Sequence, residues 1–294
     1  MEQELEQARK KALSKVLLCY SITVIIGISI MLSIRSLGIG FGFIIIGIFI
    51  DHFITRKDIQ NFNTLYKQNI VVMSMEKICT DVKFDMQKGI DRQVIASTNM
   101  MNMGDIFSSN DYVTGKYKNI NFEMSDVEIQ EESTDSEGHT TYYTIFKGQW
   151  YIFDFNKTFK ANIQVCASNF HNARRGSLFA KKEERFKKVE LEDIEFNKEF
   201  KVYAQNELDA FYVLTPGTMT KIKEVKSKIK GRLLFCFIDD RLHVALHNNK
   251  DFFEASIFKK VNVEKAIEKT NEEISAITNF VDILSLDNDL FKMN

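Results

Sequence analysis

The chain has 294 residues and a formal net charge of −1, with 39 Lys and Arg residues against 40 Asp and Glu residues. This balance excludes the basic composition that is typical of nucleic-acid-binding domains, and we expect no nucleic-acid partner. The four cysteines are widely spaced and form no CxxC pair, so the sequence predicts neither a disulfide framework nor a zinc site.

Two apolar runs lie near the start of the chain, at residues 16–34 and 37–50, and only Arg35 and Ser36 separate them. The first run would span roughly 28 Å as a helix, close to the ~30 Å hydrocarbon core of a bilayer. One helix through both runs would be about twice as long as the membrane is thick, and it would place Arg35 near the centre. The sequence therefore predicts a two-helix transmembrane hairpin over residues 16–54 that turns at Arg35.

The second apolar run is short. It crosses the bilayer only if Asp51 and His52 lie among the headgroups, or if the bilayer thins locally. A hairpin that dips into one leaflet and returns is the alternative. We expect the glycines of this run to pack against the first span, because small residues let two helices approach closely in lipid. They are the small-xxx-small pair Gly38 and Gly42, with Gly40 and Gly47 nearby. A dimer face built on these glycines is the weaker interpretation.

Basic residues on both sides of the hairpin set its predicted orientation. They are Arg9, Lys10, Lys11 and Lys15 before it, and Arg56 and Lys57 after it. The turn carries only Arg35, so the positive-inside rule places both termini in the cytoplasm. We predict a multi-pass protein of the cell membrane, with residues 1–15 as a charged cytoplasmic segment. A cleaved signal peptide is disfavoured because no small-residue cleavage site follows.

Residues 55–110 are predicted to form a helical stalk and connector. No Gly or Pro interrupts residues 55–80, and the apolar residues there recur at roughly helical spacing. Asp91 can cap a short helix further on. The methionines at 100–103 are expected to fill core space rather than to bind a soft metal.

From Asp111 the apolar spacing changes from helical to alternating, and we predict an α+β cytoplasmic domain over residues 111–294. Two strands are expected first, and about three more follow, with breaks at Lys147–Gly148 and at Asn156–Lys157. The simplest topology is a meander of about five antiparallel strands.

The next elements are short. Phe200–Tyr203 and Ala210–Leu214 are predicted strands. Thr215–Pro216 is predicted to begin a helix, because Thr is a good N-cap and Pro suits the first helical position, and Gly231 is predicted to close it. A strand hairpin that turns at Asp239–Asp240 follows.

The last helix is predicted to run from about Asn262, a candidate cap, to Leu286. Its apolar residues alternate in steps of four and three, as in a heptad seam. They are Val263, Ile267, Thr270, Ile274, Ile277, Val281 and Leu284. Phe280 and Ile283 widen this face, which favours docking on the sheet of the same chain over homo-oligomerisation. About seven strands and a closing helix would also suit a pleckstrin-homology-like roll, an analogy that is no argument for lipid recognition.

One stretch, at residues 169–188, is clearly basic and interleaved with Phe and Leu residues. Its basic side chains are Arg174, Arg175, Lys181, Lys182, Arg185, Lys187 and Lys188. Close to a membrane, such residues each add about 1 kcal/mol of attraction to anionic lipid. We therefore take them as candidate contacts to anionic headgroups or to a membrane protein partner. A solvated loop is the alternative.

Two sequence blocks resemble the bacterial domain-of-unknown-function family 3137. The first carries Phe200, Val202, Tyr203, Asn206, Ala210, Tyr212, Leu214, Thr215 and Pro216. The second carries Lys250, Asp251, Phe253 and Glu254. The earlier strand segments and the N-terminal pair of spans are also similar to the family. The resemblance implies a two-span bacterial membrane protein with a cytoplasmic domain and no assigned activity.

Catalytic constellations are hard to find in this sequence. His243 and His247 lie on one predicted strand, about 13 Å apart, too far to share a metal. Cys166 and His171 are expected to be core and surface residues rather than a nucleophile and its base. We therefore predict no catalytic residue, no metal site and no cofactor. A membrane-anchored binding or scaffold module is the favoured function, and an enzyme with an unrecognised active site is the alternative.

Overall fold

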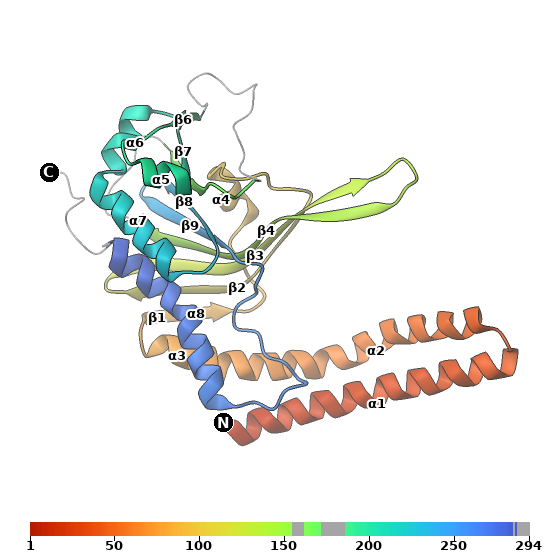
Figure 1. The fold of residues 1–294 in the computed structure, drawn as a ribbon. Coiled ribbons are helices and arrows are strands. Elements are labelled where there is room, and N and C mark those ends of the chain that lie inside the picture. The colour runs from red at the N-terminus through yellow and green to blue at the C-terminus, as the bar shows by residue number, and fades with distance from the viewer. Residues whose placement is uncertain (155–161, 172–185, 285, 287–294) are drawn as a thin grey trace. The chain divides into compact units, whose positions relative to one another are not determined.

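The computed structural model describes residues 1–154, 162–171, 186–284 and 286 (Figure 1). It has two long apolar helices, an antiparallel sheet and a C-terminal helix, so the predicted α+β class is confirmed. The chain divides into two compact units. The helical unit comprises Met1–Ser74 with Phe253–Asn271, and the sheet unit comprises Met75–Phe252 with Glu272–Asn294.

The helical unit is built on the predicted hairpin. Helix α1 covers Glu2–Ile34 and α2 covers Leu37–Tyr66, and the chain turns at Arg35, which adopts the left-handed conformation with φ of 53°. Both helices are long and apolar enough to cross a membrane. Most of their large apolar side chains are exposed, which suggests membrane association because lipid can cover such a surface.

Beyond Tyr66 the same helical path continues without a break. A π-helical segment, η1, covers Lys67–Val72, and α3 covers Met73–Glu76. The helical stalk expected after residue 55 is therefore present up to Glu76.

The two hairpin helices touch through two of the four glycines that were expected at the contact. A Cβ atom on Gly40 would lie 2.7 Å from Met31 Cβ, and one on Gly47 would lie 2.4 Å from Thr23 Cγ2. Nothing lies within 4 Å of the corresponding position on Gly38 or Gly42. The predicted packing on the first span is therefore confirmed for Gly40 and Gly47 and wrong for Gly38 and Gly42, because the contact face of α2 is the one that carries Gly40 and Gly47.

Asp51 lies inside the hairpin. Thr23 Oγ1 donates a hydrogen bond of 2.7 Å to Asp51 Oδ2, and Asp51 is buried. Thr23 is well inside the first apolar run, so Asp51 is level with that run rather than beyond its end. A hydroxyl partner reduces the cost of a carboxyl group among apolar helices.

A segment close to the C-terminus packs on the base of the hairpin within the helical unit. Arg9 Nη1 donates to the carbonyl of Ile257 at 2.7 Å, and Arg9 also pairs with Glu6 at 2.8 Å. Ile257 and Val261 join Phe62 and neighbouring side chains in an apolar cluster. One face of the charged start of α1 is thus buried against protein, at Leu5, Arg9 and Ala12.

The sheet unit contains one antiparallel sheet. The described strands are β1 Thr80–Asp85, β2 Ile106–Tyr117, β3 Ile120–Thr134, β4 Thr140–Asp154, β5 Ile163–Ala167, β6 Lys187–Val189, β7 Phe200–Ala204, β8 Arg232–Ile238 and β9 Arg241–His247. Their order across the sheet is β1-β2-β3-β4-β9-β8-β5-β7-β6. Nine strands therefore replace the expected seven or so. The meander stops after β4, because β9 and β8 lie between β4 and β5.

Several local predictions need correction. Strand β1 and the start of β2 lie in the segment 55–110, which we expected to be a helical stalk and connector. Strand β4 runs through the expected break at Lys147–Gly148, because Gly148 keeps its ladder partners Val127 and His247. Its φ of 153° is one that glycine adopts readily. The expected break at Asn156–Lys157 lies outside the described residues.

Short helices complete the sheet unit. They are α4 Arg92–Ser97, α5 Ile194–Glu199, α6 Glu207–Val213 and α7 Pro216–Lys228. The expected strand at Ala210–Leu214 is therefore wrong: that segment is helical because Asn206 Oδ1 caps α6 by accepting from the Leu208 amide at 3.1 Å. The start of α7 at Thr215–Pro216 is confirmed, but Gly231 lies three residues beyond its end.

The two faces of the sheet alternate residue by residue. Trp150 and Ile152 of β4 face a core that includes Ile95 of α4 and Met100, so the methionine segment fills core space as expected. Tyr151 and Phe153 point to the opposite face, because side chains alternate along a strand.

Helix α8, Val263–Leu284, begins in the helical unit and ends in the sheet unit. Its cap is confirmed, since Asn262 Oδ1 accepts from the Lys265 amide at 2.9 Å. Phe280 is fully buried, and its ring lies 5.1 Å from that of Tyr151. The predicted docking of this helix on its own sheet is therefore confirmed. Homo-oligomerisation through α8 stays a prediction.

Candidate functional site

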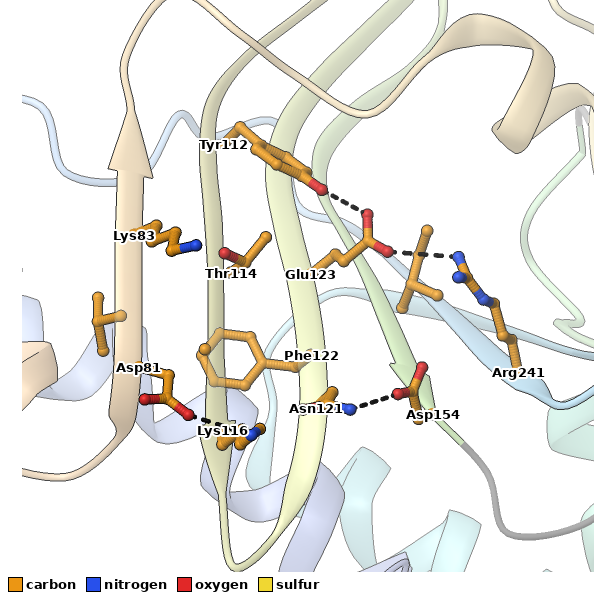
Figure 2. Close-up of a pocket in the computed structure, with 13 residues that line it drawn as sticks. Asp81, Lys83, Tyr112, Thr114, Lys116, Asn121, Phe122, Glu123, Asp154 and Arg241 are labelled. Atoms are coloured by element: carbon orange, nitrogen blue, oxygen red, sulfur yellow. Dashed lines mark hydrogen bonds and ion pairs between the residues drawn. The ribbon is translucent and has the colours of Figure 1, made fainter.

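A polar groove of about 570 Å³ lies in the sheet unit, on five neighbouring strands (Figure 2). It is open to solvent. It lies on the same face of the sheet as α4. Its lining residues are Asp81, Val82, Lys83, Tyr112, Thr114, Gly115, Lys116, Asn121, Phe122, Glu123, Ile152, Asp154 and Arg241.

The centre of the groove is a chain of three polar side chains from β2, β3 and β9. The Tyr112 hydroxyl donates to Glu123 Oε2 at 2.7 Å, and Arg241 Nη1 lies 3.3 Å from Glu123 Oε1 (Figure 2). Burial and the neighbouring Glu123 carboxylate raise the pKa of Tyr112 well above its usual value. The phenol therefore stays protonated and acts as a fixed donor to Glu123.

Two further contacts border this chain. Lys116 Nζ lies 3.1 Å from Asp81 Oδ2, and Asn121 Nδ2 donates to Asp154 Oδ2 at 2.6 Å. Lys83 points into the groove beside Thr114 (Figure 2), and its ammonium group forms no ion pair with another described residue. The groove thus presents hydroxyl, amide, carboxylate and ammonium groups of both signs within one recess.

This arrangement offers several hydrogen-bonding groups to a polar ligand. Small-molecule sites use a few convergent polar groups to orient a ligand by hydrogen bonds. The carboxylates of the groove are already engaged by donors, and among the described residues no group of His, Cys, Asp and Glu side chains is placed to hold a metal ion. A polar ligand could exchange hydrogen bonds with these groups, with Lys83 as its first cationic contact.

A second polar cluster is buried on the other face of the sheet. Gln149 Nε2 donates to Asp126 Oδ1 at 3.0 Å and to the Lys250 carbonyl at 2.7 Å. The Phe252 amide donates to Asp126 Oδ2 at 2.8 Å, and Asn248 Nδ2 donates to Gln149 Oε1 at 2.7 Å. Burial raises the pKa of Asp126 to about 8 despite these donors. The cluster fastens the segment that follows β9 to β3 and β4.

The predicted basic contacts are only partly visible. Lys187 and Lys188 lie on β6, at the edge of the sheet, and both are exposed. The Lys188 ammonium pairs with Glu190, which raises the pKa of that lysine. The other candidates lie outside the described residues: Arg174, Arg175, Lys181, Lys182 and Arg185.

The histidines and cysteines occupy structural places. Trp150 Nε1 donates to His243 Nδ1 at 3.2 Å, and the Lys147 amide donates to His247 Nδ1 at 3.1 Å. Burial lowers the pKa of His243 to about 4 and raises the pKa of Cys166 to about 12. Cys166 is thus an unreactive core thiol and His171 is exposed, in agreement with their predicted roles.

Sequence inspection missed the groove because its residues come from five separated segments. The available signal was the alternation of polar side chains along two predicted strands, with Tyr112, Thr114 and Lys116 on the first and Asn121 and Glu123 on the second. Alternation indicates that these side chains share a face, but it does not say which other strands join them.

The architecture defines a class of protein: an α+β sheet domain joined to a hairpin of two candidate membrane-spanning helices. Residues 144–286 match the family model described as "Protein of unknown function (DUF3137)". The resemblance seen in the sequence is therefore confirmed over this part of the chain. In the structure, Asn206 and Thr215 of the family block cap α6 and α7, and Asp251 pairs with Lys147 at 3.2 Å.

No curated protein matches the sequence. Among solved structures, the chain is similar to the crystal structure of the mycobacterial trehalose monomycolate transport factor A, TtfA. The identity is 9%, the TM-score is 0.43, and the match covers 75% of this chain and 95% of that chain. A likeness at this level carries no argument about function.

Proposed function

We propose that the protein is a non-catalytic binding or scaffold module of the bacterial cytoplasmic membrane. The hairpin anchors it, both termini and the sheet unit lie in the cytoplasm, and the polar groove receives a ligand or a partner group. The basic stretch at residues 174–188 contacts anionic headgroups or a membrane protein partner in this proposal.

The observation that carries the proposal is the hairpin together with its charged base. Large apolar side chains such as Leu32, Phe49 and Phe53 are more than two-thirds exposed along the two helices, a surface that lipid covers at no cost. Below the apolar runs, Lys15 Nζ pairs with Asp58 at 2.6 Å. Ion pairs at this level suit a boundary between hydrocarbon and water.

Membrane retention is the first test. The full-length chain is expected to stay in the membrane pellet after alkaline carbonate extraction, while a peripheral protein in the same sample is released. Release of the full-length chain into the supernatant would contradict an integral anchor.

The groove is tested separately, by photocrosslinking in native membranes. A photoreactive amino acid at Thr114 is expected to give a discrete adduct, whereas the same residue at exposed Ser227 on α7 serves as the control position. The adduct should weaken when Lys83→Ala and Arg241→Ala are introduced together. An adduct pattern at Thr114 that matches Ser227 and ignores these changes would argue against a binding role for the groove.

A further inference from the structure

Strands β3 and β4 extend beyond the rest of the sheet as a two-stranded arm (Figure 1). We define the arm as residues 131–144, all of which are exposed. The last residue of β3 that pairs with β2 is Gln130, and β9 pairs with β4 only from Gly148 onwards. Neither strand of the arm has another described strand beside it.

The base of the arm is held firmly. Ile129 and Phe146, which pair across the two strands, are fully buried. Asp105 donates its amide to the Gln130 carbonyl at 2.9 Å and accepts from the Glu132 amide at 3.0 Å through Oδ2. The arm therefore leaves a fixed base in a set direction, although an isolated two-stranded ribbon is only marginally stable in water.

The tip of the arm is closed by its own hydrogen bonds. Asp135 Oδ1 accepts from the amides of Glu137 and His139, each at 2.9 Å. This aspartate is occupied by the turn, so Glu131, Glu132 and Glu137 are the carboxylates that the arm offers to other molecules.

The charge of the arm is one-sided. It carries four acidic residues and no Lys or Arg, although the chain as a whole has nearly equal numbers of both signs. Charged residues on a free strand edge discourage aggregation, but lysine serves that purpose at least as well. Protection of the edge therefore does not explain why only acids are present.

The arm also exposes two aromatic rings. Tyr142 and Tyr143 are 56% and 61% exposed, and as neighbours on a strand they point to opposite faces. Glu132 lies opposite Tyr142, and Glu131 lies opposite Tyr143. Each face thus has one tyrosine ring beside one carboxylate. The flat side of a tyrosine ring attracts a cation, and a carboxylate forms an ion pair with a cation. Each Tyr–Glu pair therefore suits an Arg or Lys side chain.

We propose that the arm is a docking element for a protein segment rich in Arg and Lys, and that each Tyr–Glu pair receives one cationic side chain. The inference deepens the proposed binding role and rests on it, but none of the arm residues lines the groove. Negative charge on the arm disfavours an anionic lipid surface as the occupant.

The test uses the full-length protein in nanodiscs and two fluorescent peptides, one alternating Arg with Thr and one alternating Glu with Thr. Fluorescence anisotropy is expected to show binding of the Arg peptide alone. Changing both Tyr142 and Tyr143 to Ala should weaken that binding about tenfold. The Tyr→Phe pair should restore most of it, because the ring faces remain. Glu131→Gln with Glu132→Gln should weaken it severalfold.

Glu192→Gln with Glu207→Gln is the matched control, because it removes two exposed carboxylates from outside the arm. Equal binding of both peptides, or equal loss in the control and in the arm variants, would overturn the proposal. So would binding to phosphatidylglycerol vesicles that the Tyr→Ala pair abolishes while peptide binding is unaffected. The arm variants leave the hairpin and the groove unchanged, so failure here is distinct from failure of membrane retention or of the groove adduct.

Discussion

Asp126 shows how much a single buried side chain can depend on its surroundings. It sits in the ladder between β2 and β4, opposite Gln149, and it is 2% exposed. Loss of hydration raises its pKa to about 8, and the carboxylates of Asp111 and Asp251 act in the same direction. The two donors, Gln149 and the Phe252 amide, oppose this change without cancelling it.

This pKa predicts a pH dependence of stability. The folded chain holds the Asp126 proton more tightly than the unfolded chain, where the pKa is near 3.8. The contribution of Asp126 to stability is therefore complete below about pH 4 and is lost as the pH rises through about 8. We expect the melting temperature of the wild type to fall between about pH 5 and about pH 9. In Asp126→Asn the fall over the same pH range should be several degrees smaller.

Thermal unfolding of the full-length protein in detergent micelles, followed by circular dichroism, measures this difference. Asp240→Asn, at an exposed turn, is the matched control, and its melting temperature should change with pH as that of the wild type does. The low pKa of His243 makes the melting temperature rise with pH in the acid range. This effect is the same in every variant, so it drops out of the comparison. If the melting temperature changed with pH equally in the wild type and in Asp126→Asn, the Asp126 carboxyl group would be charged in the folded chain.

At the scale of elements, the packing of the hairpin helices and the packing of α8 each depend on a few named side chains. Gly40 is buried against Met31, while Gly38 faces open space two residues away on the same helix. The pair forms an internal comparison, because both glycines lie in one apolar run and have the same helix propensity.

Gly40→Leu is expected to destabilise the hairpin by about 1–3 kcal/mol, because the added side chain forces α1 and α2 apart. Gly38→Leu is expected to have little effect. Loss of helical signal on heating in lipid nanodiscs measures both. If Gly38→Leu were as harmful as Gly40→Leu, the contact face of α2 would be wrongly assigned.

Helix α8 is held on the sheet by Phe280, which touches Tyr151 and Phe153 with ring centroids 5.1 and 5.8 Å away. Phe280→Ala is expected to cost about 3–5 kcal/mol, since it leaves a cavity against two aromatic rings. Ser275→Ala, on the exposed side of the same helix, should cost less than about 0.5 kcal/mol. Chemical denaturation of the full-length chain tests both, and similar midpoints for the two variants would contradict the docking.

At the scale of the whole molecule, the orientation of the hairpin decides which compartment the sheet unit can serve. Arg35 is the one basic residue at the turn, whereas the segments before and after the two apolar runs carry several basic residues. Ser36→Cys is therefore expected to react with a membrane-impermeant maleimide in intact spheroplasts. Gln3→Cys should react only after permeabilisation. Three of the four native cysteines are buried, which limits the background. Protection of Ser36→Cys together with retention in the membrane would instead favour a hairpin that enters one leaflet and returns.

Features that depend on neighbours along the chain could be predicted from the sequence. The length of the apolar runs and the charge at Arg35 indicated the hairpin, because hydrocarbon thickness limits a helix that crosses it. Thr215 and Pro216 predicted the start of α7, and Asp239–Asp240 predicted the turn between β8 and β9, because capping and turn chemistry act over a few residues.

Features that depend on distant residues were decided only by the tertiary structure. The insertion of β9 and β8 between β4 and β5 brings Arg241 to Glu123, and no local pattern specifies that neighbour. The raised pKa of Asp126 requires the burial that β2, β4 and the segment after β9 supply together. The choice of Gly40 over Gly38 depends on the rotation of α2 about its axis, which the packing of α1 sets. Local periodicity determines which side chains share a face, and long-range packing determines what that face meets.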